Sequence, residues 1–114
     1  MPSSGRISRA FARRAQAGQS ALIPYVTAGF PERTSTGAVL DALVEAGADV
    51  IELGIPFSDP LADGPTIQAS SFRSLQNGTT VDGVFAEVEA FRELHDTALV
   101  LFTYQNPVLR YGVD

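Results

Sequence analysis

The stretch that decides the fold runs from Ile51 to Gly64 and has the sequence IELGIPFSDPLADG. It begins inside an apolar run, residues 48–53, that predicts a short β-strand with Glu52 at its C-terminal end. A loop rich in Gly and Pro follows, and it carries two further carboxylates, Asp59 and Asp63. A carboxylate at the end of an apolar strand must be hydrogen-bonded, ion-paired or functional, because its burial is otherwise costly.

Strands and helices alternate on both sides of this stretch. Apolar runs predict further strands at 21–27 and 97–104, and helices are expected at 34–46, 66–76 and 80–94. Continuously apolar strands favour a parallel sheet whose outer face is covered by helices. Three strands cannot close a barrel, and a complete (β/α)₈ barrel takes roughly 250 residues. We therefore expect residues 1–114 to form a partial domain, the N-terminal part of a TIM (β/α)₈ barrel with about three parallel strands.

The first nineteen residues are expected to add an amphipathic helix that ends at Gly18. Ile7 and Phe11 lie four residues apart, and Ala10 and Ala15 complete the expected apolar side. The segment contains four Arg and no acid, a composition that is also typical of an organelle transit peptide. We favour an uncleaved helix of a cytoplasmic protein.

The composition argues against several classes of protein. With no Cys and a single His, the 114 residues offer no disulfide and no cluster for an imidazole-rich metal site, so no metal is expected. No run approaches membrane-spanning length. All eight basic residues are Arg, so the stretch has no lysine for Schiff-base chemistry. Residues 20–114 carry four Arg and thirteen acids, which would repel a phosphate backbone and argue against a nucleic-acid partner.

Residues 53–65, LGIPFSDPLADGP, resemble the signature of the tryptophan synthase alpha chain family. Three shorter segments resemble the same family, at residues 24–29, 45–49 and 104–107. The resemblance implies a TIM barrel that cleaves indole-3-glycerol phosphate to indole and glyceraldehyde 3-phosphate in tryptophan biosynthesis. It also implies an α2β2 complex in which indole passes to a beta chain that carries pyridoxal phosphate, with no cofactor in this chain.

The resemblance also assigns roles to particular residues. By motif position it places the acid/base glutamate at Glu52, the second catalytic carboxylate at Asp63 and an aromatic substrate contact at Tyr25. The family's phosphate-binding loops belong to later strands, so the 114 residues alone are expected to be inactive. Loop closure or contact with the beta chain is expected of a further set: Pro56, Phe57, Asp59, Asn106 and Pro107.

The chemistry of the residues agrees with these roles. Retro-aldol cleavage next to an indole needs a proton on the ring carbon and the loss of one from a glycerol hydroxyl, and a carboxyl group such as that of Glu52 suits both tasks. A fixed carboxylate at Asp63 would stabilise the positive charge that develops on the ring.

Other interpretations stay open. Taken without the motif, Glu52 could be a strand-end ion pair and Asp63 a turn or cap residue. The chain could be a non-catalytic module that binds or modulates the beta chain. It could also belong to another phosphate-sugar barrel of aromatic amino-acid synthesis.

Overall fold

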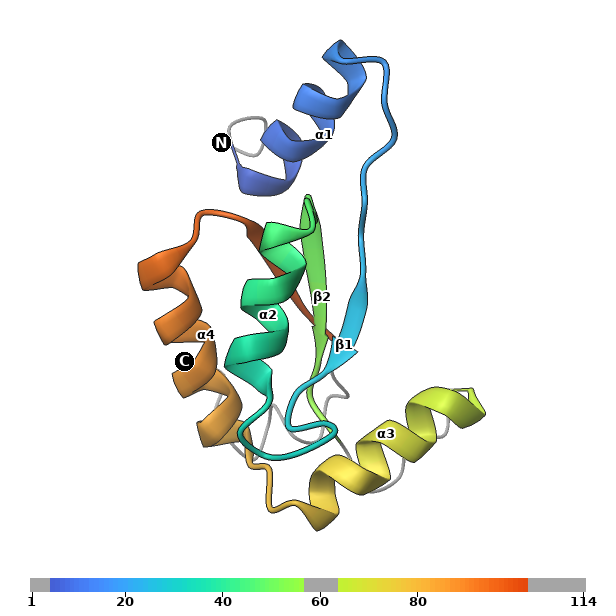
Figure 1. Ribbon diagram of the computed structural model, residues 1–114, viewed down its shortest axis with the longest axis vertical. Coiled ribbons are helices and arrows are strands. Elements are labelled where there is room, and N and C mark those ends of the chain that lie inside the picture. Colours follow the sequence, from blue (N-terminus) through green and yellow to red (C-terminus); the bar gives the residue numbers. More distant parts are fainter. Residues whose placement is uncertain (1–4, 57–63, 103–114) are drawn as a thin grey trace.

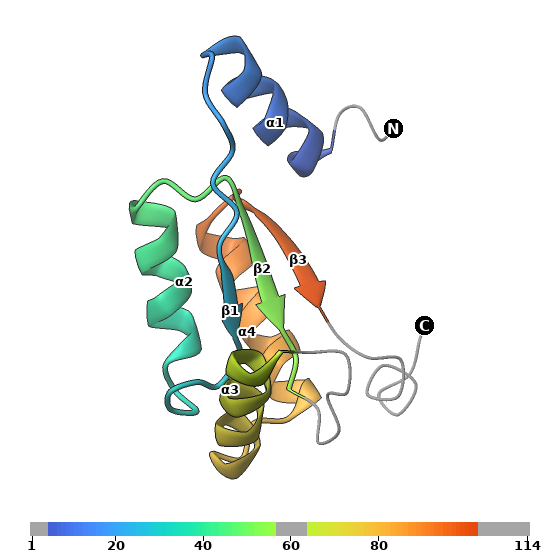
Figure 2. The same cartoon turned by 90° about the vertical axis from the view of Figure 1, so that its right-hand side faces the viewer.

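The computed structural model of the chain describes residues 5–56 and 64–102 (Figure 1). The described strands form one parallel sheet in the order β1-β2-β3, which confirms the expected architecture. Figures 1 and 2 show α2 and α4 against one face of this sheet, α1 beside the beginnings of the strands and α3 beside their C-terminal ends. The elements are α1 (Arg6–Gln16), β1 (Tyr25–Thr27), α2 (Thr36–Glu45), β2 (Val50–Gly54), α3 (Pro65–Gln76), α4 (Val81–Leu94) and β3 (Ala98–Phe102).

The main core lies between the sheet and the helices α2 and α4. From β2, Ile51 and Leu53 are completely buried in it, and their neighbours across the sheet pack against the same cluster. Leu40 of α2 is also completely buried. The core members contributed by α4 are Val84 and Phe91.

The opposite face of the sheet is covered near its beginning by α1. Ala10 is the buried residue of this helix, and it packs with Val50 and Ala98 in a second cluster. Ile7 and Phe11 are 44% and 47% exposed, so the expectation that they share the packed side with Ala10 is wrong. The contact of α1 with the strands is made by the small Ala10 side chain, while the two larger apolar side chains stay partly exposed.

The first strand is shorter than predicted because of Pro24. Residues 21–24 are extended, yet the regular strand begins only at Tyr25. Proline has no N–H to donate to a neighbouring strand, so it suits the edge of a sheet. The carbonyl of Pro24 still accepts a hydrogen bond from the Glu52 N–H, 2.9 Å away, which fixes the alignment with β2 before the regular pairing starts.

Three predicted helix boundaries are confirmed by local geometry. The α1 segment is followed by Gly18 at φ 70° and α3 by Gly78 at φ 87°, a left-handed conformation that glycine adopts without strain. Thr80 caps α4, because its Oγ1 accepts a hydrogen bond from the N–H of Gly83 at 3.1 Å.

A long-range ion pair ties α1 to the start of β2. The Arg14 Nε donates to both carboxylate oxygens of Asp49 at 2.9 Å, and the Leu22 N–H donates to one of them at 2.7 Å. The Leu22 hydrogen bond, followed by the Arg14 guanidinium, holds the pKa of Asp49 below its usual range. The ionised form of Asp49 therefore favours the folded chain.

We expect Leu40→Ala to lower the free energy of unfolding by about 2–5 kcal/mol, because it leaves a cavity in the main core. Leu94→Ala removes the same atoms from a side chain that is 71% exposed, and it should change stability by less than about 0.5 kcal/mol. Urea denaturation followed by circular dichroism measures both. Equal losses in the two variants would contradict the placement of the core.

We expect Asp49 to contribute to the acid sensitivity of the fold. Since its folded pKa is lowered, its stabilising contribution is complete above the unfolded value of about 3.9 and is lost as the pH falls through the folded value. Asp49→Asn should therefore be less stable than the natural chain at pH 6, and the difference should shrink between about pH 4 and pH 2. Urea midpoints across this range measure it, and a constant difference would show that ionisation of Asp49 is not involved.

Candidate active site at the C-terminal ends of the strands

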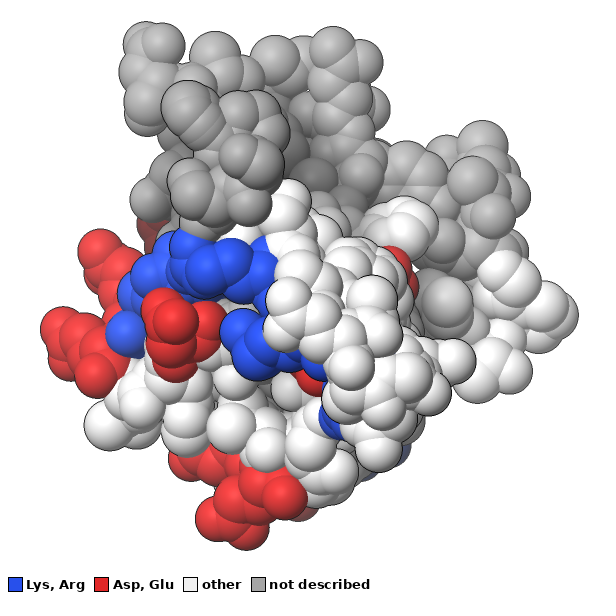
Figure 3. All heavy atoms as spheres, turned by 90° about the horizontal axis from the view of Figure 1, so that it is seen from above, with Lys and Arg blue, Asp and Glu red and all other residues white. Residues whose placement is uncertain are grey.

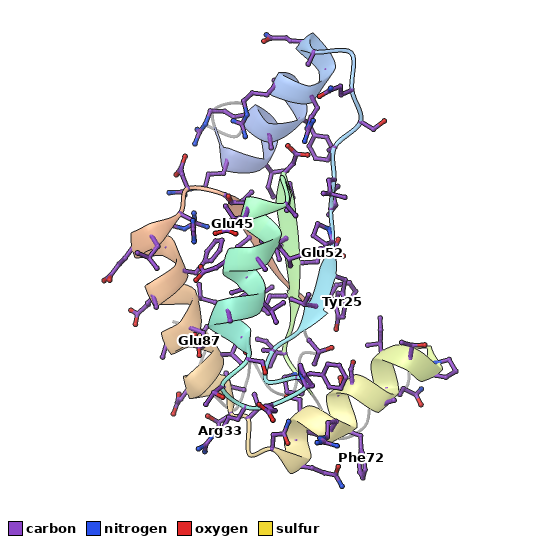
Figure 4. All side chains as sticks on the ribbon, viewed as in Figure 1. Tyr25, Arg33, Glu45, Glu52, Phe72 and Glu87 are labelled. Atoms are coloured by element: carbon purple, nitrogen blue, oxygen red, sulfur yellow. The ribbon has the colours of Figure 1, made fainter. Side chains whose placement is uncertain are left out.

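The parallel register brings two of the predicted site residues together. Tyr25 is the register partner of Glu52, which in turn pairs with Val100 of β3. Side chains at paired positions of a parallel sheet share a face, and since Ile51 and Leu53 point into the helix-covered core, Glu52 points to the opposite face. Figure 4 shows Tyr25 and Glu52 on that side, away from α2 and α4.

The Glu52 side chain is half-buried, at the third of the five residues of β2. Among residues 5–56 and 64–102, its carboxylate makes no hydrogen bond and no ion pair. A carboxylate at this position was expected to be hydrogen-bonded, ion-paired or functional. The described residues give it neither a hydrogen bond nor an ion pair. Glu52 is therefore a candidate functional carboxylate.

Tyr25, the register neighbour of Glu52, contacts a second aromatic ring. The rings of Tyr25 and Phe102 meet edge to face, with centroids 6.0 Å apart and an interplanar angle of 85°. The Tyr25 hydroxyl lies over Gly54, where the Cβ of any other residue would collide with it. The Thr27 hydroxyl also contacts the Tyr25 hydroxyl, at 3.4 Å. Phe102 is 55% exposed, so this aromatic pair is open to a flat apolar ligand.

Phe102 was not predicted as a site residue. It lies in the predicted third strand, two residues after Val100, and the register pairs it with Gly54. The alternation of side chains along the strand could have identified it once the face was known. A one-residue uncertainty in register reverses the face, however, and the sequence alone could not remove that uncertainty.

Hydrogen bonds fix α3 beside the end of β1. Ser70 and Thr27 share a hydrogen bond of 2.7 Å, and the Ser74 hydroxyl donates to the carbonyl of Ala28. The Asn77 amide donates to the carbonyls of Gly29 and Pro31, at 3.0 and 2.7 Å. These contacts hold the middle and the C-terminal end of α3 at the same end of the sheet as Gly54.

Several predicted residues lie outside the described part of the chain: Phe57, Asp59, Asp63, Asn106 and Pro107. Their predicted roles stay predictions. Pro56, expected at a subunit contact, is described and is buried.

Two further findings concern the described residues alone. They contain no group of three or more His, Cys, Asp or Glu side chains placed to hold a metal ion. No helix within them has the length and apolar character needed to cross a membrane.

The sequence pattern of the family described as "Tryptophan synthase alpha chain" matches residues 11–114. Among curated proteins, a tryptophan synthase alpha chain of Burkholderia multivorans is 53% identical over 110 residues, which are 96% of this chain and 41% of the relative. A tryptophan synthase alpha chain of Chloroflexus aurantiacus is 54% identical over the same shares of the two chains.

Solved structures agree with the sequence comparison. Tryptophan synthase subunit alpha of Legionella pneumophila superimposes with a TM-score of 0.89 at 40% identity, over 95% of this chain and 42% of that one. Tryptophan synthase of M. tuberculosis in its aminoacrylate-bound form gives 0.88 at 41% identity, over 96% and 44%. The tryptophan synthase complex of Pyrococcus furiosus gives 0.76 at 53% identity, over 82% and 39%.

The fold and the site define a parallel β/α protein of the TIM-barrel class with an inward-facing carboxylate. Because the family pattern matches most of its residues, the chain belongs to the tryptophan synthase alpha chain family. It spans about 41% of the length of the curated relatives named here and corresponds to their N-terminal part.

Gly54→Ala should displace the Tyr25 ring, because the new methyl group would meet the Tyr25 hydroxyl. We expect a loss of about 1–3 kcal/mol in the free energy of unfolding, typical of overpacking. Gly37→Ala is the matched control: it adds a methyl group within α2, where only the flexible end of Glu87 comes near, and should be neutral or stabilising by up to about 1 kcal/mol. Urea denaturation measures both, and a neutral Gly54→Ala would contradict the described position of Tyr25.

Proposed function

We propose that the protein carrying this chain catalyses the alpha reaction of tryptophan synthase, the carbon–carbon bond cleavage of indole-3-glycerol phosphate to indole and glyceraldehyde 3-phosphate. The observation that carries the proposal is the Glu52 carboxylate: it is half-buried, has no partner among the described residues and is the register neighbour of Tyr25. Membership of the family supports the same reaction. The proposal makes the protein a lyase.

Glu52 is the proposed acid/base group. A proton is added to the ring carbon that bears the glycerol chain, and another leaves the hydroxyl on the adjacent carbon. The bond between these two carbons then breaks, its electron pair returns to the ring, and the hydroxyl carbon becomes the aldehyde. One carboxyl group facing both atoms can donate the first proton and accept the second, which removes the need for a second acid.

The aromatic pair is proposed to hold the indole ring. Tyr25 and Phe102 lie on the same face of the sheet as Glu52, and a flat ring against them would have its edge toward the carboxylate. Asp63 is proposed as the second carboxylate, which attracts the positive charge that spreads over the indole as its carbon is protonated. Such a contact is stronger in the transition state than in the bound substrate, so it increases the rate of cleavage.

The proposal includes a beta chain as partner in an α2β2 complex within the cytoplasm. Pyridoxal phosphate is assigned to that partner, and this chain is proposed to need no cofactor of its own. The loop residues Pro56, Phe57, Asp59, Asn106 and Pro107 are proposed for loop closure or for contact with the beta chain. The 114 residues alone are proposed to be inactive, because the substrate phosphate has no proposed binding loop within them.

The test uses a chimera in which residues 1–114 are continued by the matching remainder of the Burkholderia multivorans alpha chain. We expect the chimera to release indole from indole-3-glycerol phosphate, and Glu52→Gln to lower kcat by about 10²–10⁴, the contribution of a general acid/base group. Asp63→Asn should lower kcat by about 10²–10³, as for the loss of one group that stabilises developing charge. Indole release is followed by absorbance.

Glu45→Gln is the matched control, because it removes one exposed carboxylate from the end of α2 (Figure 4) and should leave kcat within about twofold. A folded chimera that binds the beta chain without releasing indole would favour the non-catalytic module. A chimera that accepts only an isomeric ribulose phosphate would favour another sugar-phosphate barrel.

A further inference from the structure

A charged groove lies at the end of the sheet opposite Gly54, where the strands begin. It has a volume of about 390 Å³ and lies between α1, the C-terminal end of α4 and the first residue of β3. Figure 3 views the molecule from this end and shows Arg side chains gathered in one band beside acidic ones. The charged and titratable residues that line the groove are Arg6, Arg9, Arg13, Asp49, His95 and Asp96.

The arginines of the groove come from one side of α1. Arg6, Arg9 and Arg13 are spaced three and four residues apart, so their side chains leave the same face of the helix. All three are exposed at the surface of the groove. The arrangement thus presents several guanidinium groups to one concave space.

The carboxylates of the groove are already engaged. Asp96 accepts a hydrogen bond from Arg6 Nε at 2.8 Å, and Asp49 is held by Arg14 and by the Leu22 N–H. Arg13 has no hydrogen bond within the described residues and acts on Asp49 through its charge alone. Three arginines and two carboxylates therefore line the groove, and Arg14, outside this lining, already pairs with Asp49.

The remaining ionisable groups near the groove leave this positive excess in place. His95 at the groove wall contacts Asp41, with 2.8 Å between Nε2 and Oδ1, so that carboxylate is also engaged. Arg92 adds a further guanidinium nearby. Burial lowers its pKa, the positive charge of Arg6 lowers it further, and the negative charge of Asp96 acts in the opposite direction.

The chemistry of the groove defines the ligand that it can hold. Guanidinium groups form paired hydrogen bonds with phosphate oxygens, and a volume of this order suits a small molecule. A nucleic acid is a poor candidate, because residues 20–114 carry thirteen acids that would repel its backbone. We propose that this groove is a binding site for a small phosphorylated metabolite with at least two negative charges, held by Arg6, Arg9 and Arg13. This site is separate from Glu52 and does not depend on the proposed reaction.

The probe for the test is inorganic pyrophosphate, titrated into the chain in 0.15 M NaCl, where long-range attraction by exposed charges is largely screened. We expect saturable binding by calorimetry, with amide NMR shifts confined to α1 and residues 94–98. Arg9→Gln combined with Arg13→Gln should weaken binding at least tenfold. Arg73→Gln removes an exposed charge from α3, away from the groove, and should change the affinity by less than twofold.

Three results would overturn the proposal: no saturable binding, shifts located elsewhere, or equal effects of the groove and Arg73 variants. Tighter binding of a hexaglutamate peptide than of pyrophosphate would instead assign the surface to an acidic protein segment. If the groove variants lower the stability of the isolated chain, the same comparison is made in the chimera. Every variant of the chimera contains the same residues of the relative. A difference between variants in the affinity for pyrophosphate is therefore caused by the changed groove residues.

Discussion

The side-chain alternation of β2 is the constraint on which the rest of the structure depends. The strand is paired on both edges, and Ile51 and Leu53 are completely buried under α2 and α4. Because successive side chains point to opposite faces, the residue between them must face the other side. A slip of one residue would put the Glu52 carboxylate into an apolar core, where an unpaired charge is very costly. The apolar core thus fixes the direction of the candidate catalytic group.

The helices pack against the sheet in two different ways. The helix that is held by hydrogen bonds lies at the end of the sheet that carries the candidate active site. The helices α2 and α4 pack on the sheet through apolar side chains such as Leu40 and Phe91. The helix α3 is instead tied to β1 by hydroxyl and amide groups that use backbone carbonyls left free where the strand ends. Buried carbonyls need partners, so these hydrogen bonds stabilise the chain and also orient α3 across the C-terminal end of the sheet. That end is where TIM-barrel proteins carry their active sites.

Local signals in the sequence predicted most of the fold. The predicted helices at 66–76 and 80–94 agree within one residue with α3 and α4, because their ends depend on neighbouring residues alone. The packed side of α1 was predicted in part: Ala10 is buried as expected, whereas Ile7 and Phe11 are exposed. The residues of the ion pair between Arg14 and Asp49 lie 35 positions apart in sequence, and no local sequence pattern predicts a contact over that separation.

The sequence motif predicted Glu52 and Tyr25 as site residues, and the pairing of the strands added Phe102. Glu52 and Tyr25 lie 27 positions apart in sequence, yet the parallel pairing makes them neighbours and adds Phe102 two residues beyond their row. Pairing across a sheet is a property of the whole fold, so a single sequence can suggest which residues take part without showing which ones meet.

Two carboxylates in and just before β2 have different surroundings although they lie three residues apart. Asp49, just before the strand, is paired with Arg14, whereas Glu52, three residues later, is the register neighbour of Tyr25 and has no hydrogen bond or ion pair among the described residues. Three residues of a strand span about 10 Å, about one Debye length at roughly 0.1 M ionic strength. The arginines of α1 are engaged or exposed at the beginning of the strand, and the strand turns Glu52 away from the helix-covered core. One carboxylate therefore stabilises the fold through an ion pair, while the other has none among the residues that the structure describes.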